Sequence, residues 1–313
     1  MATAQEATLT TIITTVQVVG ISLNICIVFF NFKSLKNEPI INPSTLIYFA
    51  MGLVNVCMQL LFMLQNFLSF LCPRLFFTRK VTLPVIIFGV IFMFYSFWLT
   101  GWLCAYYCIT IVNTSHQLIV VLRRILSSFL PHILLLTAVS SIFMSVPCIW
   151  MMDMVLQMQP QTNSTLETSF TGAKLLINPV FLGIGAVLGS CLPNILAAVS
   201  TGVTTFTLLR HITKMKHNVS GYNHPNIQTL INATRTMIVF LACSVIFGAF
   251  EVMYFFGEKN TSSYSIAYIG WFVVLCFPST QALIIIHAIP KLRKTILQKL
   301  CFRNEMNNAT YST

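Results

Sequence analysis

Glu251 is the residue in this sequence whose type and setting most clearly imply chemistry. It is the only acid inside a long apolar segment, where a carboxylate must be paired, protonated or in contact with water. No basic residue is an evident partner, so a wet cavity is the simplest way to house it. Two interpretations stay open: a polar anchor in a ligand pocket, and a structural hydrogen bond.

Aromatic side chains gather in the same apolar segment and in two others. They are Phe92, Phe94, Phe97, Phe247, Phe250, Tyr254, Phe255, Tyr268, Trp271 and Phe272. A mostly apolar pocket with a few polar groups is typical of a site for small organic molecules. Many of these rings also suit ordinary packing or contact with lipid. The aromatic clusters therefore favour a small-molecule pocket near Glu251 and do not establish one.

The sequence has no residue constellation for catalysis or metal binding. Neither an HExxH nor a GxSxG pattern occurs, and no Cys-x-x-Cys framework is present. The histidines are scattered, and most fall near the predicted inner ends of the apolar segments. These are His132, His211, His217, His224 and His287. We therefore expect no enzyme activity, no cofactor and no metal site.

Membrane helices are the elements that must position these residues. Hydrophobic residues make up 56% of the chain and charged residues 8%, whereas a soluble domain carries roughly 25% charged residues. Seven apolar segments approach or exceed the roughly 20 residues that cross a bilayer. They are 8–32, 45–71, 81–112, 129–152, 178–209, 232–256 and 264–289. We predict one domain over residues 1–313, an all-α integral membrane protein with a seven-transmembrane helix bundle.

The distribution of basic residues orients the predicted bundle. Most of the 18 Lys and Arg residues fall in one set of short loops, which should face the cytoplasm. The N-terminus is therefore expected outside and the C-terminus inside. The net charge of +11 indicates attraction to anionic membrane lipid and a cytoplasmic partner, not binding to nucleic acid.

Two segments outside the bundle follow from this orientation. The longest outer loop carries Asn163 in an Asn-Ser-Thr sequon, which predicts glycosylation of a multi-pass plasma-membrane protein. After Pro290, residues 291–302 are basic and amphipathic, and they predict a surface helix on the inner leaflet.

Polar residues in the first two apolar segments are better explained by structure than by function. This set comprises Asn24, Asn31, Asn55, Gln59 and Asn66. Buried amides in membrane helices commonly bond to neighbouring helices. We therefore expect these side chains to make interhelical hydrogen bonds.

Three stretches carry a resemblance to a known family. They are FWLTGWLCAYYCITIVNTSH at 97–116, LPNILAAVSTGVTTFTLLRHITKMKHN at 192–218 and FPSTQALIIIHAIPKLRK at 277–294. The sequence resembles the type 2 (bitter) taste receptors, which are G-protein-coupled receptors. In the first stretch the matching residues are Trp98, Leu99, Leu103, Tyr107, Ile111, Asn113, Ser115 and His116.

This sequence also departs from the family pattern. Thr110 stands where the family has a lysine, and its hydroxyl can bond back to its own helix. Gln281 replaces a histidine, and Asn55 lies where the second helix has an arginine. Gly89 stands at the place of a pocket tryptophan, which implies an enlarged pocket. The contacts that hold the resting state are therefore expected to differ here.

The resemblance implies a receptor that binds small bitter compounds and activates a heterotrimeric G protein. It places the ligand pocket between the outer halves of the third, fifth, sixth and seventh helices. The expected pocket residues are Gly89, Met93, Phe94, Phe97, Phe247, Glu251, Trp271 and Phe272. The expected G-protein-facing residues are Asn113, Arg123, Arg124, Arg210, His211, Lys214 and Lys216. For the basic residues, contact with lipid headgroups is an equal alternative.

Other functions remain as alternatives to a taste receptor. A vomeronasal type 1-like pheromone receptor shares the seven-helix plan, but the stretches at 192–218 and 277–294 argue against it. A small membrane transporter would show internal repeats or several intramembrane charges, and the sequence shows neither. The sequence leaves open whether the protein forms homo- or hetero-oligomers.

Overall fold

The computed structural model describes residues 2–38, 42–76, 78–112, 117–160, 168–218, 225–257 and 264–298, with only the backbone for some of them. Its long helices are α1 (Ala2–Asn37), α2 (Pro43–Leu71), α4 (Arg79–Ile111), α5 (Gln117–Ser145), α8 (Leu192–Asn218), α9 (Pro225–Gly257) and α10 (Tyr264–Ala288). The short elements are α3 (Pro73–Phe76), α6 (Cys148–Met151), α7 (Pro179–Gly185), the π-helix η1 (Ala186–Cys191) and the strands β1 (Met152–Pro160) and β2 (Thr168–Ile177). A last helix covers Pro290–Gln298.

Six described segments are long and apolar enough to cross a membrane. They are Thr11–Asn37, Pro43–Leu71, Arg79–Ile111, Ser128–Met151, Pro179–Thr213 and Gln228–Met253. The count rises to seven if Phe272–Ala288 of α10 and Pro290–Gln298, which meet at a bend of 101°, are taken as one span. Large apolar side chains point outward from these segments, with Phe29 67% and Phe143 71% exposed. Such outward faces suit lipid as the surrounding solvent.

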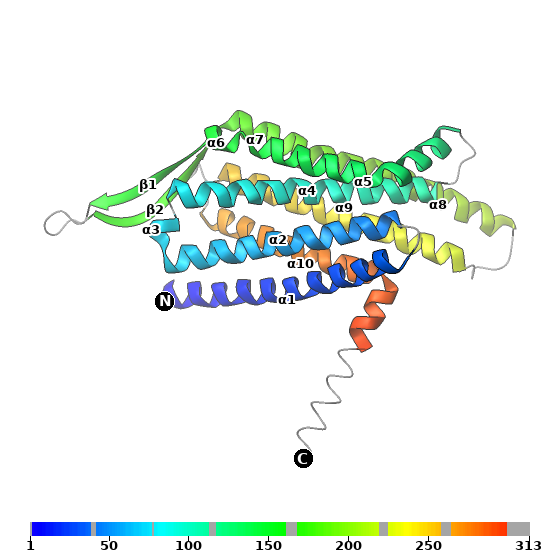
Figure 1. Ribbon diagram of the computed structural model, residues 1–313, viewed down its shortest axis with the longest axis horizontal. Helices are drawn as coiled ribbons and strands as arrows, with labels where there is room; N and C mark the ends of the chain where they lie inside the picture. Colours follow the sequence, from blue (N-terminus) through cyan, green and yellow to red (C-terminus); the bar gives the residue numbers. More distant parts are fainter. Residues whose placement is uncertain are drawn as a thin grey trace, which may run out of the picture.

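The long helices lie side by side in one bundle (Figure 1). Helix α4 packs against α2, α5, α8 and α9, while α1 packs against α2 and α10. The start of α1 and the β1–β2 pair lie at one end of the bundle, which we call the hairpin end. The start of α5 and the end of α8 lie at the opposite end.

Helix starts follow from local sequence signals. Asn42 caps α2, because its side-chain oxygen accepts a hydrogen bond from the Ser44 backbone N–H at 3.2 Å, and Pro43 follows it. Asn178 caps α7 in the same way, accepting from Val180 N–H at 2.9 Å. In both cases an Asn-Pro pair fixes where the chain enters the bundle.

The segment between the fourth and fifth spans, predicted to be the longest outer loop, has secondary structure of its own. It forms an antiparallel hairpin in which Met152 pairs with Ile177, and the register shifts between Gln157 and Met158. Pairing between strands joins residues that are far apart in the chain. Without a regular alternation of polar and apolar residues, the sequence gives only a weak indication of such strands. Asn163 lies outside the described residues.

A cluster of buried amides joins three helices near the middle of the bundle. Asn24 of α1 donates its amide to Gln59 of α2 and to the backbone oxygen of Pro278 in α10, both at 3.2 Å. Asn55 donates to Asn24 at 3.2 Å, and Gln59 donates to Ser279 at 2.8 Å. The expected interhelical bonds are confirmed for Asn24, Asn55 and Gln59.

The other two amides behave differently from this expectation. Among the described residues, Asn31 bonds only to the Ile27 oxygen of its own helix, at 2.8 Å. The side-chain nitrogen of Asn66 has no partner in the described part of the chain. The described residues give neither side chain an interhelical hydrogen bond, so the expectation was wrong for these two.

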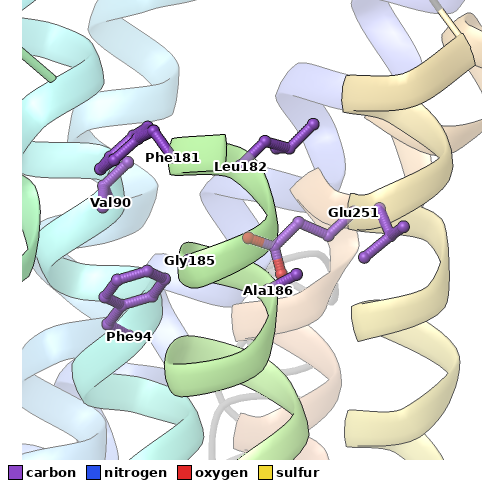
Figure 2. Close-up of a pocket in the computed structure, with 8 residues that line it drawn as sticks. Val90, Phe94, Phe181, Leu182, Gly185, Ala186 and Glu251 are labelled. Atoms are coloured by element: carbon purple, nitrogen blue, oxygen red, sulfur yellow. The ribbon is translucent and has the colours of Figure 1, made fainter. Parts of the chain in front are cut away.

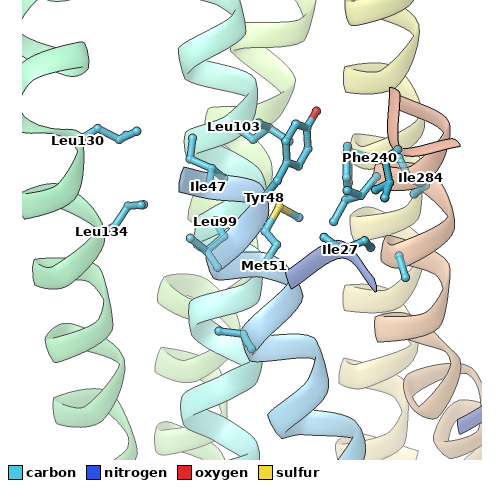
Figure 3. Close-up of a cluster of buried hydrophobic side chains, with 14 residues drawn as sticks. Ile27, Ile47, Tyr48, Met51, Leu99, Leu103, Leu130, Leu134, Phe240 and Ile284 are labelled. Atoms are coloured by element: carbon cyan, nitrogen blue, oxygen red, sulfur yellow. The ribbon is translucent and has the colours of Figure 1, made fainter. Parts of the chain in front are cut away.

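Between this amide cluster and the end of the bundle opposite the hairpin, apolar side chains fill the interior. Ile27, Met51, Leu99 and Phe240 are at most 1% exposed and come from four different helices. Figure 3 shows them converging on Tyr48, whose hydroxyl lies 2.7 Å from that of Tyr107. This packing fixes α4 relative to α1, α2 and α9. It therefore also positions the N-terminal half of α4, which lies toward the hairpin end.

We expect Asn24→Ala to destabilise the protein strongly. The change leaves the Gln59 oxygen and the Asn55 amide buried without partners, at roughly 1–3 kcal/mol for each group. Asn31→Ala is the matched control, because Asn31 is equally buried but bonds only within α1. Thermal unfolding in detergent measures both, and equal melting temperatures for the two variants would contradict the role of Asn24.

Candidate ligand pocket

A pocket opens near the hairpin end between α4, α7, η1 and α9. Its lining consists of Val90, Phe94, Phe181, Leu182, Gly185, Ala186, Glu251 and Val252. The cavity volume is about 40 Å³, which holds a few waters at roughly 10–15 Å³ each. The lining is apolar apart from one carboxylate. The lining of the pocket therefore has the composition of a small-molecule site, but its volume is small.

Glu251 supplies the single ionisable group of this pocket. Figure 2 shows its carboxyl group reaching from α9 toward Gly185 and Ala186. The side chain is half-buried, and no hydrogen bond or ion pair reaches it from the described residues. Its oxygens therefore keep their hydrogen-bonding capacity for water or for a molecule that enters the pocket.

Phe94 closes the pocket on the α4 side, and two glycines make room for its ring. A Cβ built on Gly189 would lie 2.0 Å from the ring atom Cε1 of Phe94, and one on Gly185 would lie 3.5 Å from Cζ. Any side chain at Gly189 would thus displace the ring. The glycine allows η1 and α4 to approach closely at the pocket wall.

The π-helix η1 is a local departure from regular helix beside the pocket. The Leu192 N–H bonds to the Val187 oxygen, five residues back. Trp98 of α4 donates its indole N–H to the Leu188 oxygen at 3.2 Å. Pro193 follows directly and has no N–H to donate, so the regular bonding pattern ends there. Side-chain contacts from α4 therefore stabilise the widened turn.

Three phenylalanines stack one layer deeper in the bundle. The ring centroid of Phe277 in α10 lies 5.2 Å from that of Phe97 and 4.7 Å from that of Phe247. Phe247 precedes Glu251 by one helical turn on α9. We name Phe97, Phe247 and Phe277 the aromatic layer. It connects the pocket-lining helices α4 and α9 to α10.

Phe277 was not among the expected site residues. In the sequence it is one of many aromatics, and its neighbour Pro278 attracts more notice. Only the packing of three helices shows that it joins Phe97 to Phe247. The Phe-Pro pair in an intramembrane segment is the one sequence signal that could have found it.

Polar contacts lie beneath the aromatic layer. Ser96 of α4 donates to the Gln281 oxygen at 3.1 Å, and the Gln281 amide donates to Thr100 at 3.4 Å. On the other side, Ser244 of α9 donates to Asn194 of α8 at 2.6 Å. These bonds link α4 with α10 and α8 with α9, so they couple the helices around the pocket.

The remaining expected pocket residues lie around this centre. Met93 is buried with Phe97 and Phe247 in one apolar cluster. Gly89 lies outside the pocket lining, and a Cβ there would meet only Leu61, at 3.9 Å. Phe272 is half-buried and also outside the lining, while the side chain of Trp271 is not described.

The expected G-protein-facing residues belong to the opposite end. Arg210 and His211 are exposed near the end of α8. Arg123, Arg124, Lys214 and Lys216 lie on α5 and α8, described by backbone alone, and Asn113 lies outside the described residues. The Thr110 hydroxyl donates to the Tyr106 oxygen of its own helix at 2.8 Å, as the sequence predicted.

Comparisons with known proteins point in one direction. The family model described as "Taste receptor protein (TAS2R)" matches residues 1–304. The chain is 30% identical over 292 residues to "Taste receptor type 2 member 4" of Gorilla gorilla gorilla and to that of Homo sapiens. Each match covers 91% of this chain and 94% of the relative. "Taste receptor type 2 member 40" of Gallus gallus is 24% identical over 303 residues, with 94% of both chains covered.

We expect Gly189→Ala to lower thermal stability, because the new methyl group would overlap the Phe94 ring. Gly183→Ala is the matched control, since a Cβ there meets no atom within 4 Å. Thermal unfolding of the purified protein compares them. The double variant Gly189→Ala with Phe94→Leu should lose less thermal stability than the two single variants lose in sum. Strict additivity would show that the two residues do not touch.

Proposed function

This chain belongs to the type 2 taste receptor family, and on that premise we propose that it binds small bitter compounds and activates a heterotrimeric G protein. Membership confirms the predicted family, the seven-transmembrane helical fold and the location as a multi-pass protein of the plasma membrane. The family is one of receptors and not of enzymes. The observation that carries the proposal is the family match over residues 1–304, together with an apolar pocket around one carboxylate.

In this proposal the hairpin end faces outward. The exposed basic residues Lys33, Lys36 and Arg210 lie at the opposite end, where the positive-inside tendency places the cytoplasm. Bitter compounds would then reach the Glu251 pocket from outside. Asn163 would lie on the outer side as well, available for glycosylation.

Glu251 would act as the polar anchor of the ligand. A carboxyl group in an apolar pocket favours a cationic or hydrogen-bond-donating molecule, because such a partner stabilises its charged form, which the apolar lining does not. The apolar walls from α4 and α7 suit a hydrocarbon or aromatic body. We therefore expect organic amines to be the preferred agonist class.

Ligand entry requires the pocket to widen, because the present cavity holds only a few waters. Movement of Phe94 away from Gly185 and Gly189 would enlarge it on the η1 side. Movement of α9 would act on Phe247, which touches Phe277 in the aromatic layer. A ligand that favours the wider pocket would shift the population toward a rearranged bundle.

The G protein would bind at the opposite end. Rearrangement of α9 against α8 there would open a surface bordered by Arg210 and His211. Asn113, Arg123, Arg124, Lys214 and Lys216 belong to the same proposed surface. Basic side chains in this position suit acidic residues on a G-protein subunit.

The proposal as a whole is tested by calcium release in cells that carry a promiscuous G protein. We expect a response to members of a broad panel of bitter compounds. A receptor that reaches the cell surface and responds to none of them would contradict the proposed function.

Glu251→Gln should weaken amine agonists roughly ten- to a hundredfold, the effect of losing one charged hydrogen bond. Agonists without a positive charge should keep their potency. Dose–response curves at matched surface expression measure this. Glu38→Gln removes an acid at the opposite end and serves as the control. Unchanged potency of every amine would rule out Glu251 as the anchor.

Arg210→Ala should reduce coupling, raising the agonist concentration for half-maximal response up to about fivefold, the range for an exposed ion pair. Binding of the G protein to purified receptor gives a direct measurement. Lys80→Ala is the control, because Lys80 is exposed at the hairpin end. Equal effects of the two substitutions would argue against a docking surface at Arg210.

A further inference from the structure

A second and larger cavity lies far from the ligand pocket, between the end of α1 and the helix Pro290–Gln298. Its lining consists of Ile25, Cys26, Phe29, Phe30, Lys33, Ser34, Asn37, Glu38, Leu292, Thr295 and Ile296. The cavity volume is about 640 Å³. We call it the α1 groove. Nothing in the proposed binding of bitter compounds uses it.

The sharp turn after α10 creates this groove. The chain bends by 101° between α10 and Pro290–Gln298, and Pro290 lacks the N–H that would continue the helix. Figure 1 shows the last helix leaving the bundle beside the end of α1. Leu292, 2% exposed, anchors it in the core. The two helices therefore diverge from a fixed point and leave a wedge between them.

The chemistry of the groove changes along α1. Ile25 and Phe29 are 52% and 67% exposed and form the apolar part of the α1 wall. Lys33 and Ser34 both follow about one turn after Phe29, near the end of the span Thr11–Asn37. From Ile25 to Lys33 the helix rises roughly 12 Å, close to one leaflet of the hydrocarbon core. This gradient matches a lipid with an acyl chain and a polar headgroup.

The charges around the groove favour an anionic headgroup. Lys33 makes no hydrogen bond or ion pair within the described residues and stands at the polar mouth. Further exposed basic residues flank it: Lys36, Lys291, Arg293 and Lys294. The one described acid nearby, Glu38, accepts a hydrogen bond from Ser34 at 2.8 Å. The excess of positive charge fits the anionic lipids of a cytoplasmic leaflet.

We propose that the α1 groove binds one anionic phospholipid. Its phosphate group lies on Lys33, at the polar mouth of the groove. One acyl chain runs between Phe29 and Ile296 toward Ile25. The lipid wedges the last helix at a fixed angle to α1. This inference rests on the proposed orientation, which puts the groove in the cytoplasmic leaflet, and is independent of the ligand pocket.

The headgroup contact is tested by Lys33→Gln with Lys36→Gln as the matched control. Both lysines are exposed on α1 one turn apart, but only Lys33 lines the groove. The full receptor is placed in phosphatidylcholine nanodiscs with about 10% phosphatidylserine, an anionic lipid of the cytoplasmic leaflet. Native mass spectrometry then counts the lipid retained. Wild type should retain phosphatidylserine over phosphatidylcholine, and Lys33→Gln should retain about fivefold less.

The acyl-chain contact is tested by Ile296→Trp, which fills the groove, with Leu297→Trp as its control. Leu297 is 54% exposed beside Ile296 and does not line the groove. Only Ile296→Trp should abolish retention of phosphatidylserine. Excess inorganic phosphate should not displace the bound lipid, because it lacks an acyl chain.

Several results would overturn the proposal. Equal losses in Lys33→Gln and Lys36→Gln would indicate diffuse surface charge instead of a site. Equal retention of the two lipids by wild type would remove the claim about the headgroup. Retention that appears only when the chain is truncated after Gln298 would assign the groove to the chain's own terminal residues. Retention lost on dimerisation would assign it to a second copy.

Discussion

Helices in a bilayer gain little from apolar contact with one another, because lipid is as apolar as their side chains. What fixes this bundle is therefore the need of each buried polar group for a partner. Asn24 meets that need for three helices at once, through Gln59 of α2 and the Pro278 oxygen of α10. With α1, α2 and α10 held together at this point, α4 and α9 pack against a defined surface.

The need of buried polar groups for partners also explains how the helices around the candidate site are held in place. Ser96, Gln281 and Thr100 join α4 to α10 beneath the aromatic layer, so the rings stack on a hydrogen-bonded base. Glu251 lies above the rings, and within the described residues nothing pairs with it. Gln17 and Asn66 also carry buried amide atoms without a partner in the described part of the chain, but neither of them lines the pocket. The combination of an unpaired carboxylate with an apolar cavity is what marks the pocket.

Some of this structure could be predicted from the sequence and some could not. Composition and segment length indicate membrane helices directly, and a lone acid in an apolar segment draws attention to Glu251. The back-bonded hydroxyl of Thr110 is a local property, so it was predicted correctly. The β1–β2 hairpin, the role of Phe277 and the glycine contact at Gly189 depend on which segments meet. Such contacts join distant parts of the chain, so the sequence around each residue does not predict them.

The π-helix η1 has a consequence for comparing this receptor with its relatives. A turn bonded five residues back holds one more residue than a regular turn, so it rotates everything before it by about 100° relative to α8. Residues of α7 face the pocket only because of that rotation. In a relative without the widened turn, the residue aligned with Ala186 would point elsewhere. Between this receptor and such a relative, equivalent pocket positions would be offset by one residue on the α7 side.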